Sequence, residues 1–545
     1  MAFELEHFEQ QQVDSEYISY LVDQQSPAVQ SEYSRLWNYF RNPLTAPAGL
    51  ANGVLNSHSR PYFQAQEVGL PARITGAGGG RAGESMTDVR RKEVVIENDI
   101  AWRVQTMVDF LFGKAPSFRS LAADKQQAEA IEKILSALLD ANGGVGFLQE
   151  LALLGSIYGF VDVALRIPAG GLLAPLPSFT HTAAPAGAAE SNEASSVAAA
   201  QDAAGRPGTS DISKAVPHAA DLPRLRLQAA IDCAAHLQLE AIEATRILPV
   251  VEEYDYRRLK LWVQRFHAHP SRLADSRRPW FGLLGRGRSS RPASVEVIEI
   301  ISPTWWQRYE DRQLTAEGPN SLARLPIVHI QNVALAGSYC GLSDVEPLIP
   351  LQDELNTRLS DRAQRVTYQS FKMYLGKGID DFLERPVGPG QMWATQNLNA
   401  SIEEFGNDSG SPSEDAHIEQ VRSALDKVSG VTPLAAGLIK DNVGYLTSAS
   451  ALKVCLAGLL SRTNRKRLTY GAGLQQIAEL ALAWLDEAGV FRTRPQDRRI
   501  EIHWPNVLPS DESEQLRNAQ AKAQLGLPLE RILAELGYER SVGAQ

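Results

Sequence analysis

The chain has 545 residues, of which 44% are hydrophobic and 22% charged, and its formal net charge is −10. This composition excludes global disorder and predicts several domains with sizeable cores. The acidic balance argues against a tight, sequence-independent nucleic-acid binder, because such a protein needs a basic excess to displace counterions.

Cysteine spacing and the N-terminus indicate the compartment. Cys233, Cys340 and Cys455 lie too far apart for a disulfide framework or a CxxC metal cluster, which favours a reducing cytosol. The first residues, MAFELE, are acidic and lack the basic region and apolar core of a signal peptide. Apolar stretches are broken within a turn or two by charge or glycine, so we predict a soluble chain without a membrane span.

The N-terminal part predicts a helical arm at 15–40 and then a linker rich in proline, glycine and asparagine. From Val95 to Leu111, apolar residues recur mostly at three- and four-residue steps, which predicts a helix with one buried face that ends at Gly113. Residues 168–222 are dominated by alanine, proline, serine and glycine and predict a mobile insertion, because they cannot bury enough surface to offset chain entropy. The other elements predicted before this insertion are helices at 123–139 and 147–158 and a strand at 160–167.

Residues 225–330 predict a small β-rich unit that is interrupted by one basic loop at 270–292. Apolar and polar residues alternate at 225–229, which is typical of a half-buried strand. The other predicted strands are 242–251, 259–266 as its continuation, 295–301 and 325–330.

Two capped helices follow, with a short segment between them. Ser343 and Glu346 form a capping box, and Pro347 and Pro350 move the expected helix start a few residues later. This first helix is predicted to run to Tyr368.

The second helix starts at a capping box made by Ser411, Pro412 and Glu414, and it ends at Gly430. Between the two helices, Phe371–Phe405 predicts a compact β segment with several glycines. The remaining predicted elements are a loop at 431–447, a long helix at 448–485, a strand at 500–504, and helices at 512–525 and 528–536.

We find no catalytic constellation. The stretch from Gly282 to Ser289 approaches a phosphate-binding loop, but Arg288 replaces the lysine that reaches the phosphates, so a basic surface loop is favoured. His267 and His269 have no accompanying carboxylate or cysteine cluster and predict no metal site. The sequence therefore predicts no enzyme activity, cofactor or metal, and a nucleotide hydrolase that uses the Gly282 loop stays open as the alternative of a different class.

A basic cluster lies on the long helix and includes Arg462, Arg465 and Lys466. One interpretation is a contact with nucleic-acid phosphates. The other is a solvated face or an ion pair between subunits, which an acidic chain favours.

Four stretches resemble, in this order, the portal (head-to-tail connector) proteins of tailed bacteriophages. They are Phe63–Gly76 with EVGLPARI, Asn98–Pro116 ending in DFLFGKAP, the runs LPIVH, GLSDV and IPLQDELN between 325 and 356, and Val428–Pro433 followed by Thr447–Lys453. The sequence departs from the family pattern at Thr432, which stands between valine and proline, and at Ser450, where glycine is common.

The resemblance implies an α+β, mainly helical fold with a β-rich wing, a two-helix stem, a small clip and a helical crown. If the two capped helices pack antiparallel, the segment between them projects as a tip, and a head-to-tail interface that closes by rotation makes a ring. The implied parts are an N-terminal arm and linker at 1–60, the wing at 61–342, a first stem helix at 343–368, the clip at 369–410, a second stem helix at 411–430, a tunnel loop at 431–447, a long wing and crown helix at 448–489, and a C-terminal strand with crown helices at 490–545.

The resemblance also implies a function. Such a ring, a dodecamer in the family, stands at one capsid vertex of the virion, is assembled in the host cytoplasm and passes double-stranded DNA during packaging, retention and ejection. Its expected partners are the terminase large subunit, then a head–tail adaptor, and the major capsid protein, with no membrane. Another helical virion or injection protein is the alternative.

Particular residues follow from the resemblance. Lys440, Asn442 and Tyr445 of the tunnel loop are expected to touch the DNA backbone, with an ordinary surface loop as the alternative. The aromatic residues expected at the clip interface are Phe371, Tyr374, Phe382 and Trp393. An acidic chain suits such a channel, because neutral or repulsive walls let DNA slide while occasional polar side chains make brief phosphate contacts.

Overall fold

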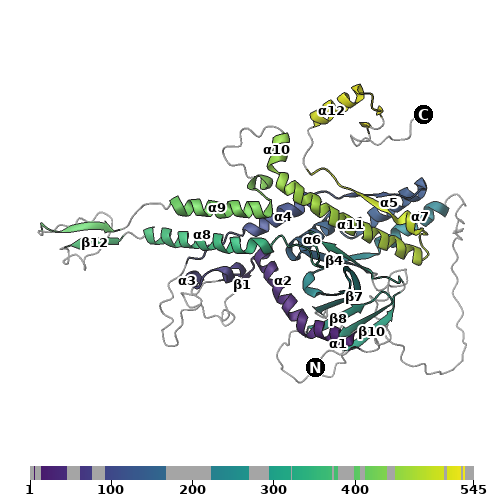
Figure 1. Cartoon of the computed structure of the whole chain (residues 1–545), viewed down its shortest axis with the longest axis horizontal. Helices are drawn as coiled ribbons and strands as arrows, with labels where there is room; N and C mark the ends of the chain where they lie inside the picture. The colour runs from purple at the N-terminus through teal and green to yellow at the C-terminus, as the bar shows by residue number, and fades with distance from the viewer. Residues whose placement is uncertain are drawn as a thin grey trace, which may run out of the picture. The chain divides into compact units, whose positions relative to one another are not determined.

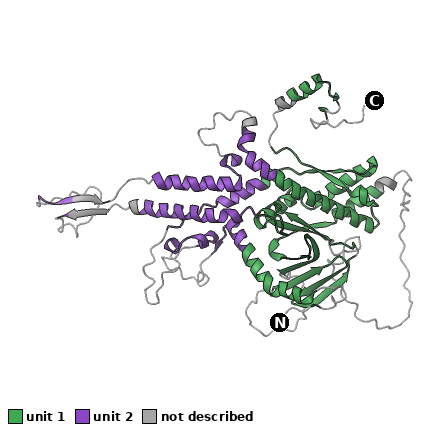
Figure 2. Ribbon diagram, in the orientation of Figure 1, with its two compact units in different colours: residues 1–33, 108–342, 464–545 green, residues 34–107, 343–463 purple. Residues whose placement is uncertain are grey.

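A computed structural model describes residues 5, 14–45, 62–75, 93–166, 222–268, 294–320, 322–370, 373–377, 398–405, 412–437, 449–507, 512–529 and 532–533. The predicted insertion 168–222, apart from Leu222, and the predicted basic loop 270–292 lie outside these residues. The fold mixes helices and sheets, as predicted, and the chain divides into two compact units (Figure 2). Unit 1 comprises 1–33, 108–342 and 464–545, and unit 2 comprises 34–107 and 343–463.

The N-terminal arm is helical over the predicted range. Helix α1 (Ser15–Tyr20) continues through a π turn (Leu21–Gln25) into α2 (Ser26–Arg41). Asp14 caps α1, because its carboxylate accepts a hydrogen bond from the backbone N–H of Tyr17 at 3.0 Å.

The largest sheet lies in unit 1 and has five antiparallel strands (Figure 1). Its strands, in spatial order, are β10 (Gln313–Pro319), β9 (Trp305–Glu310), β8 (Val295–Ile301), β7 (Asp255–Ala268) and β6 (Ile247–Glu252). One face packs against α1 and the π turn. The buried cluster between them is Ile18, Leu21, Val22, Leu248, Val250, Leu261, Val263, Ile298, Ile300 and Tyr309.

A smaller antiparallel sheet in unit 1 has the order β11 (Ile327–Gln331), β4 (Phe160–Arg166) and β5 (Gln238–Ile242). The prediction of one strand over 242–251 was wrong, because a 3-10 turn at Ala244–Arg246 separates β5 from β6. The segment at 259–266 likewise returns antiparallel to β6 rather than continuing it.

Buried polar groups link these two sheets. The carboxylate of Asp162 in β4 accepts hydrogen bonds from the indole N–H of Trp262 in β7 at 2.8 Å and lies 2.7 Å from Nδ1 of His329 in β11. The ring of Tyr339 stacks on His329 with centroids 3.8 Å apart. Burial, followed by the nearby Asp162 carboxylate, raises the pKa of Tyr339 well above its ordinary value.

Unit 1 also contains several helices. They include α5 (Lys125–Ala141), α6 (Val145–Tyr158) and α7 (Leu222–Ala235). The strand predicted at 225–229 was wrong, because these residues lie in α7, which packs against α5. Five alternating residues were too few to distinguish the two periods, and the buried Ala230 and Ala234 show the four-residue spacing of a helix.

Further described elements of the chain are β3 (Ser117–Ser120) paired with β14 (Ile500–His503), α4 (Asp99–Phe112), α10 (Ala449–Cys455), α11 (Ala457–Glu487) and α12 (Glu512–Gln524). Among the described residues, no helix is both long and apolar enough to cross a membrane. The same residues contain no cluster of His, Cys, Asp and Glu that could hold a metal ion.

Unit 2 is built around a pair of long helices that lie side by side (Figure 1). They are α8 (Ile349–Ser370) and α9 (Pro412–Ser429). Between them in sequence come β12 (Met373–Lys377) and β13 (Ser401–Phe405), which pair antiparallel. The smaller elements of unit 2 are β1 (Leu44–Thr45) paired with β2 (Phe63–Gln64), the 3-10 turn Ala65–Gly69 and α3 (Ala72–Thr75).

Candidate functional site: the α8–α9 hairpin and its base

The hairpin starts where the sequence predicted it. The Ser343 hydroxyl accepts hydrogen bonds from the backbone N–H groups of Val345 at 3.1 Å and Glu346 at 3.2 Å. A 3-10 turn then carries Pro347, and α8 begins at Ile349, a few residues after the cap, as the two prolines required. Ser411 of the second predicted box lies outside the described residues, and α9 begins at Pro412 and ends before Gly430, whose φ is +72°.

The β pair confirms a strand-containing segment between the helices. In its register Met373 faces Phe405, Tyr374 faces Glu404 and Lys377 faces Ser401. Of the aromatic residues predicted for a partner interface, only Tyr374 falls in this pair. Phe371, Phe382 and Trp393 lie outside the described residues, so the predicted interface stays a prediction.

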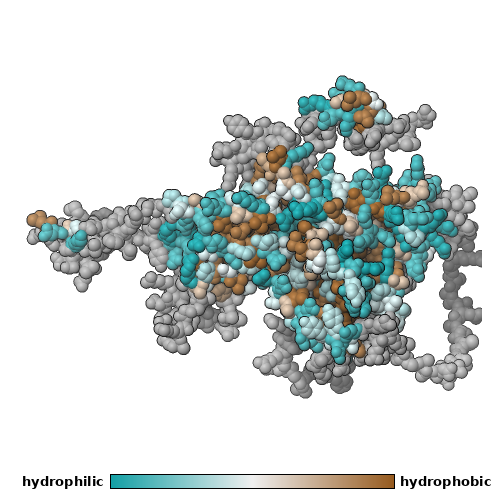
Figure 3. Space-filling view, viewed as in Figure 1, coloured by the Kyte–Doolittle hydropathy of each residue, from teal (hydrophilic) through white to brown (hydrophobic). Residues whose placement is uncertain are grey.

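Ion pairs join α8 to α9. Arg362 lies 3.1 Å from Asp415, Arg365 pairs with Glu414, and Nε2 of His417 lies 3.0 Å from the Glu354 carboxylate. Arg358 also reaches Glu354, at 2.7 Å, one turn away on the same helix. Hydrophilic residues cover much of the visible face of the two helices (Figure 3).

The buried face of α8 carries a row of polar side chains that bind an extended segment of unit 2, 95–98, where the predicted start of the helix at Val95 was wrong because α4 begins at Asp99. Gln352, Asn356 and Ser360 are almost fully buried and stand four residues apart. The amide oxygens of Gln352 and Asn356 accept from the backbone N–H groups of Asp99 at 3.0 Å and Glu97 at 3.1 Å. We call these three side chains the polar row.

The third contact follows the same rule, because the Ser360 hydroxyl accepts from the backbone N–H of Val95 at 3.0 Å. Every fourth residue of α8 therefore meets every second residue of the segment 95–99. Four helical residues rise about 6 Å, and two extended residues span about 6.6–6.8 Å. The two repeats match closely enough for side chains to take the place of a neighbouring strand.

Gln66 and Asn98 extend this network. Asn356 donates to the Gln66 amide oxygen at 3.0 Å, and Gln66 donates to Asn98 at 3.0 Å and to the Tyr39 carbonyl at 2.6 Å. Asn98 in turn accepts from the backbone N–H of Ala101 at 3.2 Å and caps α4. None of these roles was predicted from the sequence, and only the four-residue spacing of polar residues within an apolar stripe could have indicated them.

Gly69 explains one of the motifs that carried the resemblance. A Cβ at this position would overlap the carboxylate of Asp353 on α8, so any larger residue would force that side chain to move. The hydroxyl of Tyr39 donates to this carboxylate at 2.8 Å. Burial raises the pKa of Asp353, and the Tyr39 hydrogen bond only partly opposes this effect.

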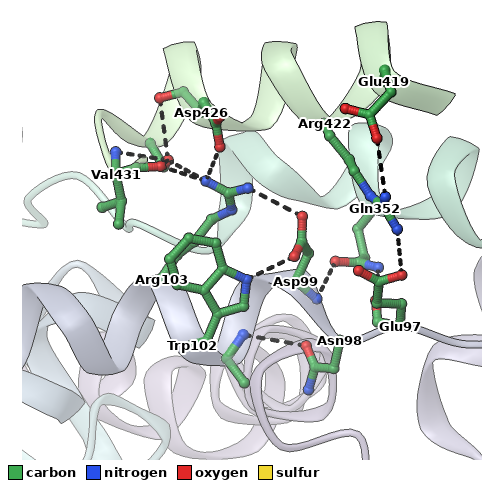
Figure 4. A network of polar contacts seen from close by, with 12 residues as sticks. Glu97, Asn98, Asp99, Trp102, Arg103, Gln352, Glu419, Arg422, Asp426 and Val431 are labelled. Carbon is green, nitrogen blue, oxygen red and sulfur yellow. Dashed lines mark hydrogen bonds and ion pairs between the residues drawn. The ribbon is translucent and has the colours of Figure 1, made fainter. Parts of the chain in front are cut away.

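Arg103 forms the centre of the hairpin's base (Figure 4). Its guanidinium is buried and donates to Asp426 at 2.7 Å, to the Val431 carbonyl at 2.6 Å, to the Ser429 hydroxyl at 3.2 Å and to Asp99 at 3.1 Å. The adjacent Trp102 ring stacks under the guanidinium at 4.4 Å. Arg103 therefore connects α4 to the end of α9 and to the first residue beyond its glycine cap.

The residues of the basic cluster on α11 have different surroundings. Arg462 binds the buried Asp344 at 2.6 Å and donates to the carbonyls of Val428 and Ser429, both at 3.1 Å. Lys466 is buried and donates to the Ser156 hydroxyl of unit 1 at 2.8 Å.

Arg465, by contrast, is exposed. A phosphate contact by Arg462, Arg465 and Lys466 stays a prediction. The neighbouring Arg467 donates to the Pro505 carbonyl at 2.9 Å and lies over the Trp504 ring.

The loop expected to carry Lys440, Asn442 and Tyr445 lies outside the described residues, as does the Gly282–Ser289 stretch. The residues on either side of the loop that carries Lys440 are described. Gly437, with φ +78°, closes a 3-10 turn after α9, and α10 begins at Ala449.

Comparison with known proteins identifies the region around the hairpin. Residues 295–538 match the family described as "Phage portal protein, SPP1 Gp6-like". Among solved structures, a chain of the "Virion of native gene transfer agent (GTA) particle" is 12% identical and aligns over 80% of this chain and 93% of its own length, with a TM-score of 0.36. No curated protein matches the sequence.

The family match covers α8, β12, β13 and α9 and the third and fourth of the stretches on which the resemblance was based. The predicted resemblance of this chain to the portal proteins of tailed bacteriophages is therefore confirmed across residues 295–538.

Proposed function

We propose that this chain is a phage portal protein, which forms a ring-shaped channel for double-stranded DNA at one capsid vertex. The observation that carries the proposal is the helix–strand–strand–helix hairpin of unit 2, which lies inside the region that matches the portal family. Two antiparallel rods that bracket a small β pair give each copy a rigid stalk with an end free to meet neighbours.

The parts of the chain take portal roles in this proposal. Helices α8 and α9 form the stem, and β12 and β13 form the clip, to which the terminase large subunit and then a head–tail adaptor dock. The β-rich part of 61–342 forms the wing, which meets the major capsid protein. The residues after 490 contribute to the crown, and 431–447 form the tunnel loop.

The charges of this chain support a channel that does not bind the DNA passing through it tightly. Each arginine of α8 and α9 is already paired with a carboxylate: Arg358 with Glu354, Arg362 with Asp415, Arg365 with Glu414 and Arg422 with Glu97. A paired guanidinium attracts phosphate less than a free one, because its charge is neutralised within about one Debye length. The net charge of −10 adds to this effect and disfavours counterion-driven binding.

The assembly state tests the proposal directly. The purified full chain is expected to form closed rings, dodecamers by family resemblance, in mass photometry, with a central hole in electron-microscopy views down the axis. A chain that stays a compact monomer in every solution condition, and that is missing from virions, would contradict the proposal.

The tunnel loop offers a second test. Replacing residues 437–444 by a glycine–serine linker of the same length removes Lys440 and Asn442 but keeps the chain connection. Rings are expected to form as before, while packaged DNA in particles falls. Unchanged packaging would show that this loop does not face the DNA.

A further inference from the structure

We propose that His329 is a proton-controlled latch, which holds the loop 332–342 against β11 only while both of its ring nitrogens carry a proton. This loop leads along the chain from the end of β11 to the Ser343 cap before α8. The residues of the latch all belong to unit 1. The latch would operate whether or not the chain forms a ring, because it depends only on one histidine and the groups around it.

The ring of His329 lies between two hydrogen-bond acceptors. Its Nδ1 is 2.7 Å from the carboxylate of Asp162 in β4, and its Nε2 is 2.9 Å from the carbonyl oxygen of Tyr339 in the loop. A backbone carbonyl and an ionised carboxylate can only accept hydrogen bonds. Since both distances are those of hydrogen bonds, each nitrogen must donate, and the ring is an imidazolium.

The surroundings of Asp162 place the shared proton on the ring rather than on the carboxylate. The side chain of Asp162 is fully buried, and it accepts hydrogen bonds from the indole N–H of Trp262 at 2.8 Å and from the Tyr339 hydroxyl at 3.3 Å. With His329, three donors converge on this carboxylate, and an ionised carboxylate can accept from all of them without a proton of its own. The positive ring also balances a negative charge that has no access to water.

Loss of one proton from His329 leaves one of its two contacts without a hydrogen. A neutral ring that keeps its proton on Nδ1 turns the Nε2 lone pair toward the Tyr339 carbonyl, which is repulsive at 2.9 Å. The other tautomer turns the Nδ1 lone pair toward the buried charge of Asp162, which is more costly. The neutral ring therefore releases the Tyr339 carbonyl, and the latch opens on the side of the loop.

Neutral amides hold the same loop at any pH. Gln331 donates to the carbonyls of Ser338 at 3.0 Å and Tyr339 at 2.8 Å. Asn332 donates to the carbonyl of Leu342 at 2.9 Å. Because these hydrogen bonds do not depend on a proton, opening of the latch loosens the loop without unfolding it.

The other titratable groups of this cluster keep their protons between pH 5 and 8, the range in which histidine changes its charge. They are Tyr33 of α2 and Tyr339 and Cys340 of the loop, and burial is the first cause that raises the pKa of each above its ordinary value. The exposed carboxylate of Glu32 adds to this effect at Tyr33 and Cys340. The charge within this cluster is therefore expected to change at His329.

Nitrogen NMR of the full chain, labelled with ¹⁵N at histidine, tests the protonation of the ring. Magic-angle spinning of sedimented protein makes the measurement independent of particle size, and the signal that disappears in His329→Gln identifies the ring. Both nitrogens are expected to carry a proton near pH 5.5, and one is expected to be bare near pH 8.5. A bare nitrogen near pH 5.5, or two protonated nitrogens near pH 8.5, would overturn the proposal.

Amide hydrogen exchange tests the effect on the loop. After correction for intrinsic rates, protection of the segment 335–342 is expected to be about tenfold lower near pH 8.5 than near pH 5.5, while β4 and β8 keep theirs. His329→Gln has no charge at any pH and should lose this dependence. The matched control is His267→Gln, which should keep it, because His267 is exposed on β7.

A pH dependence of loop protection that persists in His329→Gln would overturn the proposal, as would its loss in the control. If His329→Gln does not fold, the wild-type protein decides the question by NMR. The ring is then identified by transfer between histidine ¹⁵N and tyrosine carbonyl ¹³C, since Nε2 of His329 lies against the Tyr339 carbonyl.

Discussion

The five-stranded sheet of unit 1 and the helix α8 of unit 2 each bury one face, but the side chains on the two faces differ in chemistry. The sheet face under α1 is apolar, with side chains such as Val263, Ile300 and Tyr309 excluded from water. The buried face of α8 instead presents Gln352, Asn356 and Ser360, each bonded to backbone or amide groups. The two faces therefore stabilise the fold in different ways.

An apolar face gains free energy in proportion to area and tolerates small shifts of its partner. A polar row does not tolerate such shifts. Each buried donor or acceptor must meet its own partner, because a buried polar group without a hydrogen bond destabilises the fold by its cost of desolvation. At α8 the partner is a segment without strand or helix, 93–98, none of whose residues is buried. The polar row thus specifies register where burial alone cannot.

The largest expected effect is in the apolar face. Ile300→Ala removes a fully buried side chain from the centre of the sheet and leaves a cavity under α1. We expect the free energy of unfolding of unit 1 to fall by about 2–5 kcal/mol. Urea unfolding followed by tryptophan fluorescence measures it. A loss below 1 kcal/mol, on the order of a surface change, would mean that the face is not packed as described.

The matching change in the polar row is Asn356→Ala. It leaves the Glu97 N–H and the Gln66 amide oxygen without their partner, so unit 2 is expected to lose about 1–3 kcal/mol. The distinguishing result is local: amide exchange at Glu97 should rise, while amides of the five-stranded sheet stay protected. Asn356→Leu, which is apolar and similar in size, should be no better than alanine, because it satisfies neither group. A stabilised leucine variant would contradict the role assigned to the polar row.

The comparison also shows what the sequence could reveal. Helices α8 and α9 were predicted from local signals, their caps, prolines and apolar stripes, because those signals lie within the helix that they specify or just before it. The function of the polar row was not predictable, since Asn356 meets Glu97, which is more than two hundred residues away. The role of Arg103 was not predictable either. In the sequence of its own helix it is a single cation, and only the fold brings α9 into contact with it.

Local patterns failed where two periods fit the same few residues. The strand predicted at 225–229 and the helix observed there both place apolar side chains at short intervals, and the alanines and leucines of α7 favour a helix. Likewise the strand predicted across 242–251 contains Ala244–Arg246, whose turn is not marked by a glycine or a proline. The confirmed family resemblance depended on order and spacing over hundreds of residues, which no single element carries.

Two neighbouring carboxylates of α8, Glu354 and Asp353, have pKa values shifted in opposite directions, so their contributions to stability depend on pH in opposite ways. Burial acts to raise the pKa of Glu354, but the hydrogen bonds from Arg358 and His417 outweigh it and the pKa lies below its ordinary value. The stability that Glu354 contributes is therefore present above the unfolded pKa, about 4.3, and is lost as pH falls through the lower folded value. Asp353 is the reverse case, because burial raises its pKa and its protonated form is the favoured one.

Opposite pH slopes are the expected result. Glu354→Gln should destabilise unit 2 by less than about 1 kcal/mol at pH 7, since the pair is partly exposed, and the difference from wild type should vanish near pH 3. Asp353→Asn keeps an acceptor for Tyr39, and its stability relative to wild type should improve as pH rises from 3 to 7. Denaturant titrations at both pH values measure this. Slopes of the same sign for both variants would contradict the burial assigned to Asp353.

The smallest effect is expected at the outer ion pairs, where neither apolar burial nor a polar row operates. Arg362 and Asp415 are each about half exposed, whereas Glu414, the partner of Arg365, is mostly buried. A double-mutant cycle on Arg362 and Asp415 should therefore give a coupling energy below about 0.5 kcal/mol, and the cycle on Arg365 and Glu414 a larger one. Raising the salt concentration to 1 M should abolish the first coupling and leave much of the second, because screening acts mainly on exposed charges. Equal couplings in high salt would show that the two pairs share one environment, and the outer face of the hairpin would then be less solvated than the structure indicates.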